Sequence, residues 1–146
     1  MVELPKIMNG EIRCDERGCV SFCNAFNFDS IQRFYHIHHD DSKVIRAFHG
    51  HMKEEKYVYV VNGEILFSAV YITDPCTPSD KEKVHQFVLS AKQPQILFIP
   101  ASYANGFRSL TDTCDVLFFS TVTLQNSLND DVRFDPYYWG DVWQNL

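Results

Sequence analysis

Histidines are concentrated in one short part of this 146-residue chain. Five of the six lie between His36 and His51, in the clusters HIHH (36–39) and HGH (49–51). An imidazole titrates near neutral pH, so it can take a proton from a substrate as a general base, and the neutral ring is also a common metal ligand. The closely spaced pair His49 and His51 is therefore a candidate either for proton transfer or for metal binding, whereas His39 and the other histidines are expected to be surface or strand residues.

The elements that position these side chains are predicted to be short strands. Segments rich in Val, Ile, Phe and Tyr occupy residues 31–37, 44–51, 56–61, 64–72, 84–89, 96–99 and 115–123. Turn-forming clusters lie at 74–80, 91–95 and 100–106. Such dense strands with almost no helix predict one all-β domain over residues 1–146, a sandwich or a barrel. On the strand 44–51, His49 and His51 are two residues apart and point to one face.

Two local patterns carry further expectations about the fold. Asn62-Gly63 separates two predicted strands, and this pair is typical of a two-residue hairpin in which both central residues need positive φ. The C-terminal stretch VRFDPYYWGDVWQNL is aromatic, acidic and irregular. We expect it to fold over an opening of a barrel or to pack against a partner subunit.

Composition excludes several classes of function. The 13 basic and 19 acidic side chains give a net charge of -6, so nucleic-acid binding is not expected. No apolar run approaches the roughly 20 residues that span a bilayer, and the N-terminal residues lack the apolar core of a secretory signal. The sequence therefore predicts a cytoplasmic protein without a membrane partner. Its five cysteines form no CxxC pair, and we expect reduced thiols packed as small apolar groups.

The run RAFHGHMKEEKYVYVVNG (46–63) resembles the first motif of the cupin superfamily. The parts of that motif, H-x-H, a glutamate and a later glycine, correspond to His49, His51, Glu54 or Glu55, and Gly63. The resemblance implies a small cupin-type barrel, also called a double-stranded β-helix or jelly roll. Many cupins bind a metal through these groups and a further histidine, whose place here is taken by Asn105. Because an amide oxygen is a poorer ligand than imidazole, we predict no metal and no cofactor.

A metal-free branch of the cupins fits more of the chain. From about residue 10 to residue 143, the sequence resembles the nucleotide-sugar epimerases of the dTDP-4-dehydrorhamnose 3,5-epimerase family. The similar segments are Asp15-Glu16-Arg17-Gly18, Arg46-Ala47-Phe48-His49, Lys56, the stretch 99–107 (IPASYANGF), and Asp135-Pro136 with Trp143. The sugar 3,4-ketoisomerases are similar as well, since they carry R-x-F-H-x-H, which residues 46–51 match, and a strand like 31–37.

This resemblance implies proton transfer beside the keto group of a nucleotide-linked 4-keto-6-deoxy sugar, in the synthesis of surface polysaccharides. Such a reaction needs a base, a group that stabilises the enolate oxygen, and an acid that returns the proton. His49 is the expected base, Asp135 is expected to orient it, and Lys56 is expected beside the oxyanion. His51 is a further catalytic candidate because it matches the ketoisomerase string.

Four residues are expected to bind the substrate. Arg17 and Arg46 carry guanidinium groups that suit a diphosphate or sugar hydroxyls, and Asn105 and Tyr35 are the other two candidates. Each proposed role has an ordinary alternative: the two arginines and Lys56 as solvated charges, and Asp135 before Pro136 as a turn residue.

One departure from the epimerase pattern affects the acid. These enzymes use a tyrosine on the strand that 114–121 resembles, and its place falls at or near Phe118, which cannot exchange a proton. The alternatives are a hydroxyl from Tyr35, Tyr57, Tyr59 or Tyr71, or a single-face 3,4-ketoisomerisation by His49 and His51. A metal-dependent cupin enzyme and a non-catalytic carbohydrate-binding cupin are the rivals of other classes. The resemblance also implies a homodimer that exchanges a sheet edge or the N-terminal segment.

Overall fold

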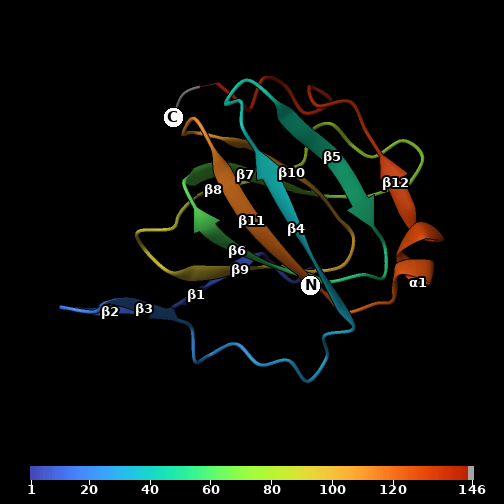
Figure 1. Cartoon of the computed structure of the whole chain (residues 1–146). Helices are drawn as coiled ribbons and strands as arrows, with labels where there is room; N and C mark the ends of the chain where they lie inside the picture. Colours follow the sequence, from blue (N-terminus) through green and yellow to red (C-terminus); the bar gives the residue numbers. More distant parts are fainter. Residues whose placement is uncertain (145–146) are drawn as a thin grey trace.

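The computed structural model of the chain describes residues 1–144 and contains two five-stranded antiparallel sheets packed on each other (Figure 1). The first sheet has the order β1 (Lys6–Asn9), β9 (Gln95–Ile99), β6 (Lys56–Asn62), β11 (Cys114–Ser120) and β4 (Arg33–His39). The second has the order β12 (Asp131–Arg133), β5 (Ile45–His51), β10 (Tyr103–Ser109), β7 (Glu64–Tyr71) and β8 (Val84–Ser90). The short helix α1 (Leu124–Leu128) leads into β12. The prediction of an all-β fold is confirmed.

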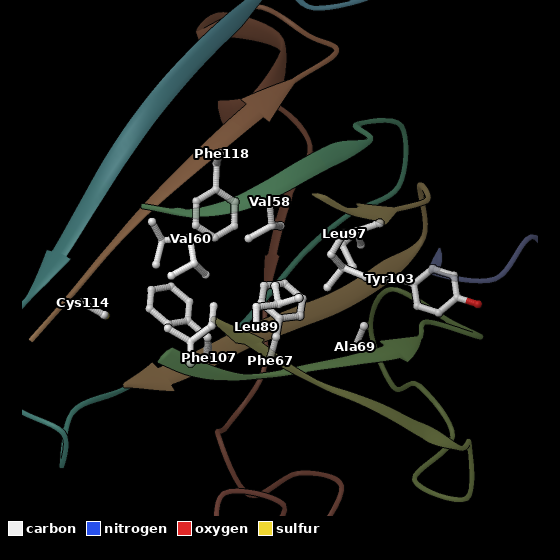
Figure 2. Packing of buried hydrophobic residues seen from close by; sticks show 13 residues of the cluster. Val58, Val60, Phe67, Ala69, Leu89, Leu97, Tyr103, Phe107, Cys114 and Phe118 are labelled. Atoms are coloured by element: carbon white, nitrogen blue, oxygen red, sulfur yellow. The ribbon is translucent and has the colours of Figure 1, made fainter. Parts of the chain in front are cut away.

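The main hydrophobic core lies between the two sheets. Along β6, Val58 and Val60 are buried while the alternate residues are only partly so, which is the period of two expected for a strand with one covered face. Figure 2 shows these valines and Phe118 of the first sheet pointing toward Phe67 and Phe107 of the second. The apolar patterning of the strands therefore accounts for how the sheets stack.

The turn predicted at 100–106 is wrong from Tyr103 onward, where the chain forms the strand β10. From Tyr103 onward this segment is a strand hydrogen-bonded to β5 on one side and to β7 on the other. Ala104, Asn105 and Gly106 are poor strand formers by propensity. Their small size is what the position requires, because the strand is buried through its first five residues. Packing between two neighbouring strands overrides local propensity here.

The hairpin predicted at Asn62-Gly63 is also wrong. β6 pairs with β9 and β11, whereas β7 pairs with β10 and β8, so this turn carries the chain from one sheet to the other. Only Gly63 has positive φ (79°). A Cβ at Gly63 would lie 2.3 Å from the Thr113 carbonyl oxygen, so glycine is required both for the turn and for the close approach of this loop.

The C-terminal segment covers the outer face of the second sheet. Trp139 and Trp143 pack against Phe48 of β5, with ring centroids 4.9 Å and 5.4 Å away. Both indole nitrogens donate hydrogen bonds to backbone carbonyls, of Ser79 at 2.9 Å and Pro136 at 2.8 Å. Within the described residues, this segment is therefore part of the fold and supports β5 from behind. Asn145 and Leu146 of the stretch lie outside the described residues.

The hairpin of β2 (Glu11–Asp15) and β3 (Gly18–Phe22) projects away from the two sheets (Figure 1). Cys14 and Cys19 are directly opposite one another in this hairpin and form a disulfide. The prediction of five reduced thiols is therefore wrong for these two, because strand pairing brings residues five apart face to face; Cys23, Cys76 and Cys114 are free. In residues 1–144, no helix has the length and apolar character needed to cross a bilayer.

Candidate active site

A cavity of about 310 Å³ opens between the two sheets, beside the hydrophobic core. The first sheet contributes Tyr35, Ile37, Lys56 and Phe118, and the second contributes Arg46, His49, His51, Asn105, Gly106 and Phe107. Phe107 and Phe118 belong to both the core and the cavity lining. The cavity therefore has an apolar border and a polar part, to which the second sheet contributes two histidines and an arginine and the first sheet contributes a lysine.

A bulge in β5 puts Arg46 and His49 on the same wall. Asn105 of β10 is opposite His49, and Phe107, two residues on, is opposite Arg46, so β5 contains one extra residue. In a regular strand, residues three apart point to opposite faces, and the bulge removes this alternation. Ala47 and Phe48 belong to the outer cluster with the tryptophans, while Arg46 and His49 on either side of them line the cavity.

Gly106 makes the bulge sterically possible. A Cβ at this position would lie 2.3 Å from Ala47 Cβ and 2.6 Å from the Arg46 carbonyl oxygen. Real side chains never approach so closely, so a larger residue would push β5 away from β10. The orientation of Arg46 and His49 toward the cavity thus depends on a glycine in the neighbouring strand.

His49 is half-buried in the cavity wall. Burial lowers the pKa of its imidazole below the ordinary value, and the positive charges of Arg133 and Lys56 lower it further, while Asp131 opposes them. The ring is therefore neutral at neutral pH and free to accept a proton. Its register partners in the second sheet are Asn105 on one side and Arg133 on the other.

A fully buried carboxylate, Glu54, lies under the polar wall. Its Oε2 is 3.5 Å from Lys56 Nζ and 3.6 Å from His51 Nδ1, and its Oε1 is 3.8 Å from an Nη atom of Arg33. Neither oxygen has a hydrogen-bond partner among residues 1–144. Burial lowers the pKa of Lys56, and the Glu54 charge opposes this effect. Glu54 thus favours the cationic form of a lysine whose surroundings disfavour it.

His51 is the more buried of the two cavity histidines. Its Nε2 lies 3.3 Å from Ser127 Oγ and 3.6 Å from Asp131 Oδ1. With Glu54 near Nδ1, the ring is flanked by carboxylates on both sides. Burial is nevertheless the largest influence and, with Lys56, lowers the pKa of His51. His51 therefore links the cavity wall to a set of charged groups behind it.

The opposite wall carries Tyr35 and Phe118, which are register partners on β4 and β11. Their rings are stacked with centroids 5.0 Å apart and planes 4° apart. The Arg33 guanidinium carbon lies 4.9 Å from the Tyr35 ring centroid. Burial raises the pKa of the Tyr35 phenol, and the charge of Glu54 adds to that effect, so the hydroxyl retains its proton.

Arg46 and Asn105 are both in the cavity lining, where the sequence predicted substrate-binding residues. Arg46 Nε donates a hydrogen bond to His39 Nε2 at 3.2 Å. His39 is buried and stacks on Phe107, with centroids 5.0 Å apart. Asn105 is buried, and its amide donates to the Tyr103 carbonyl at 3.4 Å.

Two predicted site residues lie elsewhere in this chain. Arg17 is at the turn of the projecting hairpin, where it is exposed and pairs with Asp15 at 2.6 Å. Asp135 follows β12, and its Oδ1 accepts a hydrogen bond from the Tyr137 backbone N–H at 2.8 Å. This contact is typical of an aspartate that forms a turn before proline. The residue of β12 that is paired with His49 on the neighbouring strand is Arg133.

Sequence reasoning missed three residues around the cavity. Glu54 was a candidate for a metal motif, whereas the structure gives it a buried pairing with Lys56. The sequence around Asp131 has no distinguishing pattern, and His39 is expected there to be a surface or strand residue, whereas the structure buries it beside Arg46. Among residues 1–144, no three His, Cys, Asp or Glu side chains are grouped so as to hold a metal ion. Two features could have indicated these residues. The alternation of more and less buried residues along β4 places His39 on the covered face, and the Glu-x-Lys spacing brings Glu54 close to Lys56.

Comparison with known proteins gives this geometry a context. Residues 5–143 match the model of a protein family described as dTDP-4-dehydrorhamnose 3,5-epimerase. Among curated proteins, no sequence matches this chain.

Solved structures of sugar-modifying enzymes have a similar fold. The dTDP-6-deoxy-D-glucose-3,5-epimerase RmlC from Legionella pneumophila, in complex with dTDP-4-keto-L-rhamnose, is 19% identical with a TM-score of 0.76, over 95% of this chain and 78% of that chain. NovW, a 4-keto-6-deoxy sugar epimerase from Streptomyces spheroides, is 15% identical with a TM-score of 0.79, over 97% and 75%. The sugar 3,4-ketoisomerase QdtA from Thermoanaerobacterium thermosaccharolyticum, in complex with TDP, is 19% identical with a TM-score of 0.72, over 95% and 94%. These likenesses confirm the predicted cupin-type fold.

Proposed function

This chain belongs to the dTDP-4-dehydrorhamnose 3,5-epimerase family, and on that premise we propose that it epimerises a nucleotide-linked 4-keto-6-deoxy sugar with His49 as the base. The chain is an enzyme of the nucleotide-sugar epimerase and isomerase class. The C–H bonds beside the sugar's keto group are acidified, so a neutral imidazole can remove one of their protons. The product is an enolate that needs electrostatic stabilisation.

The observation that carries this proposal is the convergence of His49 and Lys56 on one cavity from two different sheets. His49 is neutral because of burial and its cationic neighbours, as a base must be. Lys56 is held next to Glu54, which favours the ammonium form needed beside an oxyanion. The two groups therefore supply proton abstraction and enolate stabilisation within the same cavity.

Substrate binding is assigned to Arg46 and Asn105, which line the same cavity. The hydrogen bond to His39 fixes the Arg46 side chain and leaves its terminal amino groups for an oxyanion such as a diphosphate. The buried amide of Asn105 lies opposite His49 in the sheet, so it is placed to contact the sugar near the reacting carbon. No cofactor enters this proposal.

A 3,4-ketoisomerase acting on the same substrate class is the second candidate. The observation that favours it is the presence of both His49 and His51 on one wall, while Phe118 stands on the other. Two imidazoles on one face can remove a proton at C3 and deliver one at C4 without an acid on the opposite face. The two candidates therefore differ in the carbons that exchange protons with solvent.

Solvent deuterium distinguishes these outcomes. The enzyme is incubated with dTDP-4-keto-6-deoxyglucose in D2O, and C3, C4 and C5 are followed by NMR. Deuterium at C3 and C5 with inverted products supports the 3,5-epimerase. Deuterium at C4 of a new 3-keto sugar supports the 3,4-ketoisomerase, because the proton removed from C3 is replaced by one delivered to C4. No deuterium at any carbon of the sugar contradicts both proposals and supports a protein that only binds a sugar.

We also propose a homodimer, working in the cytoplasm. Phe28 and Phe34 are 64% and 66% exposed, and both rings lie beside Phe119, so they form one apolar patch on the surface. Such a patch is typical of a surface that contacts another protein. Arg17 lies at the end of the projecting hairpin, a position from which it can contact a second copy of the chain. In this dimer, Arg17 binds the substrate in the cavity of the partner subunit, which keeps its predicted role. Sedimentation analysis tests the homodimer directly.

A further inference from the structure

We propose that Tyr35 is the general acid that returns a proton to the sugar from the face opposite His49. The inference rests on the proposed function, since it concerns the second half of the same reaction. Inversion at a carbon requires that a proton leave from one face and arrive at the other. The base is on β5 of the second sheet, so the acid has to come from the first sheet.

Tyr35 and Phe118 form the aromatic part of that opposite wall. They lie on neighbouring strands in direct register, and their stacked rings are 5.0 Å apart. Both rings line the cavity, but only Tyr35 has a hydroxyl. An acid group that would be expected at Phe118 is therefore present one strand away, on the partner ring of the same stack.

The other tyrosines that the sequence left open lie elsewhere. Tyr57 packs on Phe26 and Phe98, away from the cavity, with centroid distances of 5.2 Å and 5.0 Å. Tyr59 is on the same face of β6 as Tyr57, because strand residues alternate, whereas Lys56 lines the cavity. Tyr71 packs edge-on against Tyr103. Among residues 1–144, Tyr35 is the tyrosine that lines the cavity.

The proton inventory of the step is simple. His49 takes the proton from the carbon beside the keto group, and the electron pair of the C–H bond moves into the enolate next to Lys56. The enolate carbon then takes the hydroxyl proton of Tyr35 on its other face, which leaves a phenolate. Solvent reprotonates Tyr35 and removes the proton from His49, so the sugar is isomerised and nothing is consumed.

The surroundings of Tyr35 suit this role. Burial and the nearby Glu54 charge raise the pKa of the Tyr35 phenol, so it holds a proton at neutral pH. The phenolate formed after transfer has the Arg33 guanidinium carbon 4.9 Å from its ring centroid, and this charge stabilises the anion until solvent reprotonates it. The stack with Phe118 fixes the plane of the ring.

The test compares Tyr35→Phe, Phe118→Tyr and the double variant Tyr35→Phe/Phe118→Tyr with the wild-type enzyme. Each is incubated with dTDP-4-keto-6-deoxyglucose in D2O, and deuterium in the recovered substrate and in the inverted product is measured separately. Tyr35→Phe removes one hydroxyl and keeps the stacked ring, so its fold, checked by circular dichroism and thermal unfolding, should be retained. We expect exchange into substrate to continue, because His49 is intact, and inversion to fall by about 100-fold or more through kcat.

The double variant returns a hydroxyl to the other ring of the stack, and we expect it to recover at least part of the inversion. Inversion at the wild-type rate in Tyr35→Phe would overturn the role, and so would a rise in KM with kcat unchanged, which would make Tyr35 a binding residue only. A lack of exchange in the wild-type enzyme would overturn the proposed function and the acid role together. Exchange without any inverted product in the wild type would leave the proton transfer standing and overturn the role of Tyr35.

Discussion

Replacing Glu54 by glutamine tests how the polar wall is held together. The change keeps the size of the side chain and removes its charge. Glu54 is the carboxylate that Lys56, His51 and Arg33 share, at distances of 3.5 to 3.8 Å. Its side chain has no exposed surface, and that of Lys56 is only 6% exposed. Solvent therefore cannot replace the lost charge.

The magnitude follows from these distances. Two unit charges 3.5 Å apart attract by about 5 kcal/mol at an effective dielectric constant of about 20. Removing one partner of a buried pair costs about 3 to 5 kcal/mol of the free energy of unfolding. Small domains have about 5 to 15 kcal/mol in total, so Glu54→Gln should fold but be clearly less stable than the wild type.

The loss should depend on pH through Lys56. Burial lowers the pKa of Lys56 below 10.5, and without Glu54 the pKa falls further. Between the folded and unfolded pKa values, the unfolded chain binds more protons, so the free energy of unfolding rises with pH. The deficit of the variant is therefore greatest near neutral pH and smaller at pH 9.5, where Lys56 loses its proton at less cost.

Urea unfolding of the wild type and the variant at pH 7 and pH 9.5 measures both effects. Glu55→Gln is the matched control, because Glu55 is the next residue, is partly exposed and has no ion pair among the described residues. We expect the control to change stability by less than about 0.5 kcal/mol. If Glu54→Gln behaved like this control at both pH values, the buried carboxylate would not hold Lys56, and our reasoning about the wall would be refuted.

Three further predictions concern the cavity. The pH profile of proton exchange should have its acid limb below the ordinary imidazole pKa of 6.5, because burial and the Arg133 charge lower the pKa of His49. Arg133→Gln should move that limb to higher pH, and an unmoved limb would exclude an effect of Arg133 on the pKa of His49. Gly106→Ala should cost about 1 to 3 kcal/mol in urea unfolding and reduce kcat, since its Cβ would meet Ala47 at 2.3 Å; wild-type kcat would show that the bulge does not position His49. Arg46→Gln should raise KM for the nucleotide sugar by about 10-fold or more, the loss of one charge-assisted hydrogen bond, and an unchanged KM would remove Arg46 from substrate binding.

Strand periodicity predicted the part of the fold that depends on local pattern. The alternation in residues 56–61 and the H-x-H spacing are properties of single strands, and the structure has both histidines on one cavity wall. The pairing of strands is not local. Asn62-Gly63 has the composition of a hairpin turn, yet its two flanking strands join different sheets, a choice made by the core they cover.

Several features of the structure that the sequence did not predict also depend on how strands pair and pack. Arg46 shares a wall with His49 only because of a bulge that requires Gly106 in another strand. Glu54 becomes a counterion only once burial removes it from water. The disulfide between Cys14 and Cys19 depends on the register of a hairpin whose strands have no buried face. The bulge and the burial of Glu54 depend on contacts between segments far apart in the sequence, whereas the disulfide depends on the register of one local hairpin.

The most direct test of the central claim is the rate at which the substrate protons beside the keto group exchange with D2O in His49→Asn. His36→Asn is the matched control, because that imidazole is exposed and bonds to Asp115 at 2.7 Å on the outer side of β4. If His49 is the base, exchange falls by about 100-fold or more in His49→Asn and is unchanged in His36→Asn. Exchange in His49→Asn within a few-fold of the wild-type rate would contradict the claim.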